Sequence, residues 1–223
     1  MLGNNFNAAT KKVYEYLYSE IVNNRIKPGS ALSEMEIAKT LQSSRSPVRE
    51  ALMALENEGL VWRYPGRGCF VREISMRDIA EIFELRILLE TTALRHSCQY
   101  IAPEELTFVE QKFLSLEGDI SPAEYYEADR LFHELIWENC GNARLVSFLR
   151  TLSGQVEWIR RLAAARPERF ARSRQEHLEV VAAIKAQDVD TACALLQKHI
   201  ENVRTNTEMV YMRLSTGPGK TSY

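Results

Sequence analysis

The chain has 223 residues, of which 45% are hydrophobic and 26% are charged, and its formal net charge is −2. This composition excludes intrinsic disorder, because the apolar content is large enough to form a packed core, and it excludes a uniformly basic protein. The sequence has no apolar run of about 18 residues and no secretory signal, so we expect a cytoplasmic protein without membrane contact. The cysteines are widely separated and form no C-x-x-C pair, which argues against a thiolate zinc site.

The charged residues are unevenly distributed along the chain. Residues 1–72 hold ten Lys and Arg against seven Asp and Glu, whereas residues 73–223 hold eighteen against twenty-three. A mildly basic first third followed by an acidic remainder is consistent with a nucleic-acid-binding head on a body that has another role.

The first third of the sequence predicts three short helices. Apolar residues recur at helical spacing over residues 13–23, and Ser33 with Glu36 forms the capping-box pattern that begins a second helix. A third helix is expected to begin at Ser46, with Pro47 at the first helical position, where the missing N–H costs nothing. Three helices of this kind are typical of a helix-turn-helix domain.

Two short strands are predicted after the third helix, at residues 60–64 and 69–71, joined by a Pro-Gly-Arg-Gly turn. Beyond residue 73 only helical patterns recur, over residues 76–98, 103–117, 122–140, 143–165, 168–186 and 189–213. The sequence therefore predicts a mainly α protein. It consists of a winged helix-turn-helix domain at residues 1–73, an all-α antiparallel helical bundle at 74–214 and a polar tail at 215–223.

Positive charge at the start of the third helix indicates a negatively charged partner. Arg45 and Arg49 lie four residues apart, at a helix N-terminus that already carries partial positive charge. With this helix in a major groove of DNA, Arg45, Ser46 and Arg49 would reach phosphates or guanine edges. Arg67, which follows Gly66 in the hairpin turn, would lie over the adjacent minor groove. An isolated pair of arginines would more simply be a solvated helix start. The order of the predicted elements, three short helices followed by a hairpin that carries Arg67, favours DNA binding instead.

Three of the four histidines lie on apolar helix faces. His133 follows Asp129 by one helical turn, whereas His177 and His199 lie eleven residues before and after Asp188, at the centre of a break between two helices. In an antiparallel pair both would stand roughly 16 Å from the turn and face each other. Taken singly, each histidine is more simply a hydrogen-bonded core residue. Together, three imidazoles and a carboxylate predict a divalent metal site, with zinc first and nickel, manganese or iron as alternatives.

Arg86 shares its helix face with apolar residues, so its guanidinium is expected to point into the bundle. A buried arginine beside a metal favours a bound carboxylate, held by two parallel hydrogen bonds. An internal ion pair with a residue such as Glu90 is the alternative. Arg86 is therefore a candidate for binding a small organic acid.

Residues 10–72 resemble the winged-helix domain of the GntR family of bacterial transcription regulators, on the segments SRSPVREAL, EGLV and GRGCFV as they stand here. The resemblance implies DNA contacts by the residues named above: Arg45, Ser46, Arg49, Gly66 and Arg67. The chain departs from the family at Gln42, where a glycine is usual, and at Met35, where some members carry a DNA-contacting arginine.

Residues 77–212 resemble the FCD ligand-binding domain of the FadR-type branch of the same family. Similar members bind a metal through a D-x-x-x-H pair and two later histidines, which correspond to Asp129, His133, His177 and His199. The resemblance implies a central metal whose open coordination positions accept a small carboxylate effector. Asn142 also matches, and we expect it to cap a helix.

These patterns predict a DNA-binding transcriptional regulator and not an enzyme. We expect a repressor that works as a homodimer on a palindromic operator, because one winged helix buries too little surface for strong specific binding. A small organic acid bound at the metal would control its operator affinity. The alternatives are a metal-dependent enzyme that uses the His/Asp site to activate water, and a regulator in which the metal is the signal or is structural.

Overall fold

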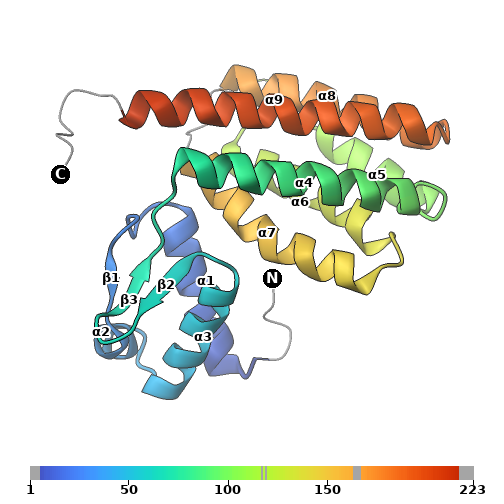
Figure 1. Cartoon of the computed structure of the whole chain (residues 1–223). Coiled ribbons are helices and arrows are strands. Elements are labelled where there is room, and N and C mark those ends of the chain that lie inside the picture. The colour runs from blue at the N-terminus through green and yellow to red at the C-terminus, as the bar shows by residue number, and fades with distance from the viewer. Residues whose placement is uncertain (1–5, 117, 119, 163–166, 216–223) are drawn as a thin grey trace. The chain divides into compact units, whose positions relative to one another are not determined.

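The computed structural model describes residues 6–116, 118, 120–162 and 167–215 (Figure 1). The chain divides into two compact units, Met1–Ile82 with Arg150–Ala164 and Phe83–Leu149 with Ala165–Tyr223. The predicted domain limits, 1–73 and 74–214, remain predictions. The predicted tail begins at the last residue of the final helix, and residues 216–223 lie outside the described part of the chain.

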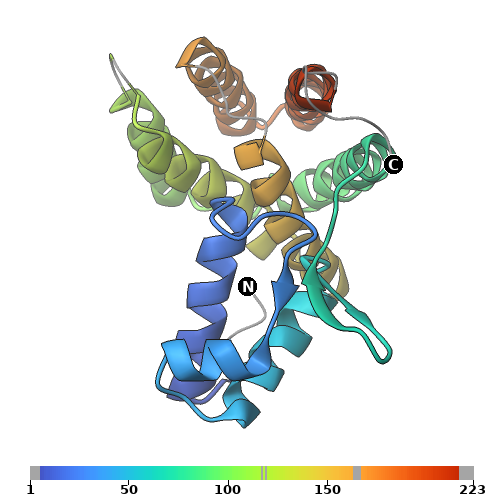
Figure 2. The ribbon, with the colours of Figure 1, turned by 90° about the vertical axis from the view of Figure 1, so that its left-hand side faces the viewer.

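The first unit begins with three helices and a small sheet, which are α1 (Ala8–Val22), β1 (Ala31–Leu32), α2 (Glu34–Thr40), α3 (Arg45–Asn57), β2 (Val61–Tyr64) and β3 (Gly68–Val71). The strands form an antiparallel sheet in the order β1-β3-β2, with Trp62 opposite Phe70. In Figure 2 the turn between β2 and β3 extends away from the helices. This arrangement confirms the predicted winged helix-turn-helix. The pairing of β1 with β3 was not predicted, because two residues carry no periodicity.

The start of α3 differs from the prediction. The helix begins at Arg45 with Ser44 as its N-cap residue, so Pro47 occupies the third helical position and not the first. Proline is tolerated throughout the first turn, because none of the N–H groups there has an intrahelical partner. Ser46 is consequently not the cap, and its hydroxyl donates instead to Glu50 Oε1 at 3.3 Å.

The core of the first unit lies between α1 and α3, where fully buried apolar side chains meet. These side chains are Val13, Leu17 and Ile21 from α1, with Val48, Leu52 and Leu55 from α3. Tyr14 is buried beside them, and its hydroxyl donates to both carboxylate oxygens of Glu58, at 2.8 and 2.7 Å. The apolar residues predicted at helical spacing in α1 are therefore among those that pack against α3.

The described residues after β3 form six further helices, as predicted: α4 (Met76–Ser97), α5 (Pro103–Leu114), α6 (Pro122–Glu138), α7 (Ala143–Leu162), α8 (Pro167–Lys185) and α9 (Val189–Ser215). In the second unit α8 packs against both α5 and α9, and α5 also packs against α6. Helices α8 and α9 run side by side in opposite directions, joined by a short turn (Figure 1). Asn142 caps α7 as expected, since its Oδ1 accepts from the backbone N–H of Arg144 and Leu145.

All four cysteines are buried and free. None of the described helices combines the length and the apolar content needed to cross a bilayer.

Candidate metal centre and DNA-binding surface

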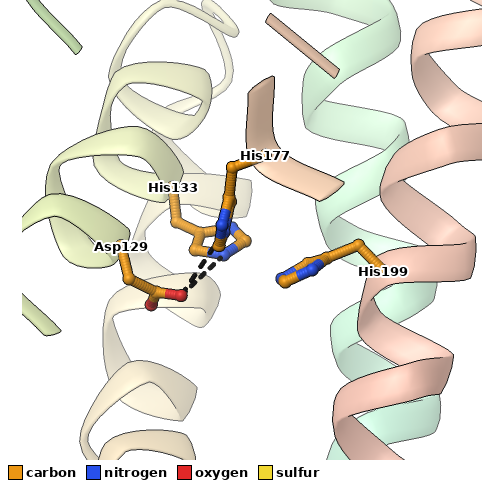
Figure 3. A group of neighbouring side chains, drawn as sticks. All are labelled: Asp129, His133, His177 and His199. Carbon is orange, nitrogen blue, oxygen red and sulfur yellow. Dashed lines mark ion pairs between the residues drawn. The ribbon is translucent and has the colours of Figure 1, made fainter. Parts of the chain in front are cut away.

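Four buried side chains from three helices meet inside the second unit (Figure 3). Asp129 and His133 come from α6, His177 from α8 and His199 from α9, and one ligand atom of each lies within 4.8 Å of the others. Asp129 Oδ1 lies 3.3 Å from His177 Nε2 and 3.9 Å from His133 Nε2. The rings of His177 and His199 have centroids 4.2 Å apart, so the two histidines placed symmetrically about Asp188 do face each other.

His133 is oriented by a carboxylate from α4. Its Nδ1 lies 2.6 Å from Glu90 Oε2, and the other oxygen of Glu90 accepts from Arg86 Nε at 2.6 Å. Burial by itself would raise the pKa of Glu90, but the charges and hydrogen bonds of Arg86 and His133 lower it to about 2. An ionised carboxylate only accepts, so Nδ1 of His133 donates to Glu90, and the lone pair of Nε2 accepts from Arg86 Nη2 at 2.8 Å.

His199 is oriented in the same way by a carboxylate from α8. Its Nδ1 lies 2.8 Å from Glu176 Oε2, while Nε2 is buried with no hydrogen-bond partner in the described part of the chain. Burial lowers the pKa of His199 well below its usual value, and the nearby His177 and His133 lower it further. The imidazole is therefore neutral at neutral pH, with an available lone pair on Nε2.

His177 and Asp129 are fixed by aromatic neighbours. The ring of His177 stacks on Phe113, with centroids 4.5 Å apart and an interplanar angle of 12°, and meets Phe132 edge-on at 4.8 Å. Tyr125 donates to Asp129 Oδ1 at 3.4 Å and also hydrogen-bonds to Ser173. Stacking and hydrogen bonding thus hold both buried side chains in place.

These residues fit a divalent transition metal. Three imidazoles and one carboxylate, close enough to share an ion, form a donor set typical of zinc sites. The carboxylates on the outer nitrogens of His133 and His199 are the supporting contacts that metal-bound histidines usually make. Glu176 was missed from the sequence, because its partner lies on another helix and no spacing along the chain relates the two.

Arg86 is buried beside this cluster, with 3% of its surface exposed. The ion pair with Glu90 that the sequence left open is present, and Arg86 Nη2 also lies 2.8 Å from His133 Nε2. Its remaining nitrogen, Nη1, is buried and has no hydrogen-bond partner among the described residues. Arg86 therefore combines the internal ion pair with one donor that remains unused.

The residues predicted to contact DNA lie on the surface of the first unit. Arg45, Ser46, Arg49 and Arg67 are exposed. Arg49 Nε donates to Glu34 Oε2 at 2.7 Å, so a contact with a phosphate requires it to leave this exposed pair. Such exposed pairs contribute little stability, so replacing the contact with Glu34 by a contact with a phosphate costs little free energy.

Glycine and glutamine adopt left-handed backbone conformations in this domain. Gly66 and Gly68 have φ of 73° and 100°, which lets the hairpin turn tightly around Arg67. Gln42, the departure noted from the family pattern, has φ of 50° in the turn before α3. Glycine would adopt this conformation without strain, whereas glutamine adopts it at some cost.

Two family models match the chain. One, described as the FCD domain, matches residues 81–202, and the other, described as bacterial regulatory proteins of the gntR family, matches residues 9–71. The chain belongs to the GntR family and carries an FCD domain. This GntR protein is a DNA-binding transcription regulator, as the sequence predicted, and its family comprises transcription regulators that bind DNA and typically dimerise.

Individual relatives agree with this assignment. The Nta operon transcriptional regulator of Aminobacter aminovorans is 28% identical over 207 residues, which cover 89% of this GntR regulator and 98% of the relative. The structure of E. coli McbR/YncC is 22% identical and has a TM-score of 0.77, covering 94% of this chain and all of that one. The FCD domain of TM0439, solved with Zn²⁺ bound, is 23% identical and has a TM-score of 0.57, covering 65% of this chain and 99% of that one. At these identities the two structures establish the fold of the GntR regulator, and the second is an FCD domain that holds zinc.

Proposed function

We propose that this GntR regulator is a repressor that binds a palindromic operator as a homodimer and releases it when a small organic acid binds at a metal in the FCD domain. The observation that carries the proposal is the convergence of Asp129, His133, His177 and His199 within 4.8 Å in a buried site. Purely structural core histidines have no need to converge with a buried carboxylate on one point. A shared metal ion would bind the nitrogens and the carboxylate that converge there, which explains their burial together.

The four residues of the cluster would hold the metal, with zinc as the first choice and nickel, manganese or iron as alternatives. A metal held by these residues would supply a Lewis acid to which a carboxylate could bind. Arg86 contributes the second half of the acid site, because its unused Nη1 is a donor suited to a carboxylate oxygen. Glu90 keeps Arg86 in place through the bond to Nε.

DNA binding is assigned to the start of α3 and to the hairpin turn. Arg45, Ser46 and Arg49 would contact phosphates or guanine edges in a major groove, and Arg67 would enter the adjacent minor groove, where Gly66 lets the backbone turn. Two copies related by a dyad would contact half-sites about one helical turn apart. The acid regulates only through a difference in its affinity for the two states of the dimer, and a coupling of about 1 to 3 kcal/mol suffices.

The test is a titration of operator binding. Duplexes selected from a random pool by the full-length protein serve as the operator, and fluorescence anisotropy reports binding by zinc-loaded and chelator-treated protein across a panel of small organic acids. We compare His177→Ala with His96→Ala, because His96 is an exposed histidine on α4. The acid should weaken operator binding by zinc-loaded wild type and His96→Ala, but not by His177→Ala.

Three other outcomes would contradict the proposal. An acid response that survives in His177→Ala would separate the acid from the metal site. Operator binding that responds to zinc alone would make the metal the signal. Consumption of the acid by zinc-loaded protein would favour a metal-dependent enzyme.

A further inference from the structure

A tryptophan next to the metal cluster carries a buried donor that nothing in the described structure satisfies. Trp137 is 5% exposed, and its Nε1 has no hydrogen-bond partner among the residues that the structure describes. Buried polar atoms in native proteins are nearly always hydrogen-bonded, so an unpaired donor in the core indicates a missing water or ligand. An indole nitrogen only donates, and its missing partner must therefore be an acceptor.

Trp137 lies one helical turn after His133 on α6, so Asp129, His133 and Trp137 form one line along the helix. The rings of His133 and Trp137 have centroids 6.4 Å apart and an interplanar angle of 32°. Arg86 contacts the same histidine, with Nη2 at 2.8 Å from His133 Nε2. Two buried donors have no partner in the described part of the chain, Trp137 Nε1 and Arg86 Nη1, and both belong to side chains that neighbour one candidate metal ligand, His133.

The first unit provides an internal comparison. Trp158 Nε1 is also buried and has no hydrogen-bond partner among the described residues, but the four-residue cluster belongs to the other unit. An unpaired indole alone is therefore insufficient to indicate a ligand. The difference at Trp137 is the second unpaired donor and the four-residue cluster next to it.

We infer that Trp137 determines effector specificity by donating a hydrogen bond from Nε1 to a second polar group of the bound acid. This inference rests on the proposed function, in which Arg86 and the metal take the carboxylate. The effector class is then a hydroxy acid, a keto acid or a dicarboxylate, and not a plain alkyl acid. A site built to donate a hydrogen bond discriminates strongly against an analogue without the acceptor, because the buried donor is left unpaired.

The experiment compares two four-carbon acids, succinate and butanoate, and two three-carbon acids, lactate and propanoate. Their affinities for zinc-loaded full-length protein are measured by calorimetry in wild type, Trp137→Phe and the control Trp158→Phe. Phenylalanine retains an aromatic ring and removes the N–H. Zinc affinity, measured by competition with a chromophoric chelator, should be the same in all three proteins.

We expect wild type and Trp158→Phe to prefer the acid with the second acceptor in at least one pair. Trp137→Phe should bind that acid about tenfold more weakly and leave the affinity of its alkyl partner unchanged. In wild type labelled with ¹⁵N-indole, one buried indole resonance should shift with the preferred acid and not with its alkyl partner. This second measurement does not depend on the folding of a variant.

Equal weakening of both acids in Trp137→Phe, or no change in either, would overturn the inference while leaving the proposed function in place. An ordered water that accepts from Nε1 whichever acid is bound would also make the two acids respond alike to Trp137→Phe. Failure of all four acids to bind zinc-loaded wild type would overturn the proposed function, and the inference with it.

Discussion

Nδ1 of His199 lies 2.8 Å from Oε2 of Glu176, which stands on α8 directly before His177. Glu176 is itself held by both terminal nitrogens of Arg169, each at 3.1 Å, and by Asn202 Nδ2 at 3.0 Å. The carboxylate therefore cannot turn away from the histidine. It fixes the tautomer that leaves Nε2 of His199 free for a metal.

Replacing Glu176 with glutamine should weaken zinc binding by about 10- to 100-fold, because the amide is a weaker acceptor and no longer favours the metal-binding tautomer. Competition with a chromophoric chelator measures the change. Glu179→Gln is the matched control, since Glu179 is an exposed glutamate on the same helix. Equal zinc affinity in the two variants would show that Glu176 only packs against Arg169.

Arg45 is the first residue of α3 and is exposed. If it contacts a phosphate, Arg45→Ala should weaken operator binding about tenfold and reduce the slope of log affinity against log salt by about 1. If it contacts a guanine, the variant should instead relax specificity at one base pair. Arg77→Ala, at an arginine that is 87% exposed on α4, serves as the control. Unchanged affinity, slope and specificity would remove Arg45 from the interface.

Tyr14 links the core of the first unit to the carboxylate of Glu58. Burial raises the pKa of Tyr14, and the nearby Glu58 raises it further, so the hydroxyl stays protonated and donates. Tyr14→Phe removes a hydrogen bond to a buried charged group and should lower the free energy of unfolding by about 1.5 to 3 kcal/mol. Urea denaturation followed by circular dichroism measures the loss. Tyr16→Phe, at a tyrosine that is 38% exposed, should change it little, and an equal loss in both would contradict the assignment.

Asp78 closes a capping box at the start of α4, where its Oδ2 accepts from the backbone N–H of Ser75 and from its hydroxyl. Burial raises the pKa of Asp78, but these hydrogen bonds and Arg72 outweigh it and leave the pKa below its usual value. The folded state therefore gains stability from ionised Asp78 above the unfolded pKa of about 4, and loses it as the pH falls through the lower folded pKa.

Asp78→Asn should lower the free energy of unfolding by about 1 kcal/mol at pH 7, a typical value for a helix cap. The difference from wild type should shrink progressively as the pH falls from about 4 through the lower folded pKa of Asp78, because wild type then loses the same contribution. Denaturation at a series of pH values measures this convergence. Glu81→Gln, an exposed change one turn further along α4, should show neither effect. A difference that persists at low pH would mean that Asp78 acts through packing and not through its charge.

Much of the fold follows from patterns within single segments. The helical spacing of apolar residues located α4 to α9, and the Ser33 and Glu36 pattern located the start of α2, because both signals depend on neighbours within a few residues. Pro47 was predicted at the first helical position of α3 but occupies the third, since proline is acceptable at any position of the first turn. Trp137 was missed, although its spacing from His133 could have indicated it.

The sequence by itself determined which residues share a helix face, and so it placed His133 one turn after Asp129 and put His177 and His199 at equal distances from a turn. Only the tertiary structure decided which nitrogen of His133 and His199 faces the cluster, because Glu90 and Glu176 reach them from other helices. The spacing of apolar residues along a helix indicates which face of that helix is buried. The partner met across that face depends on how helices pack, which no spacing along the chain specifies.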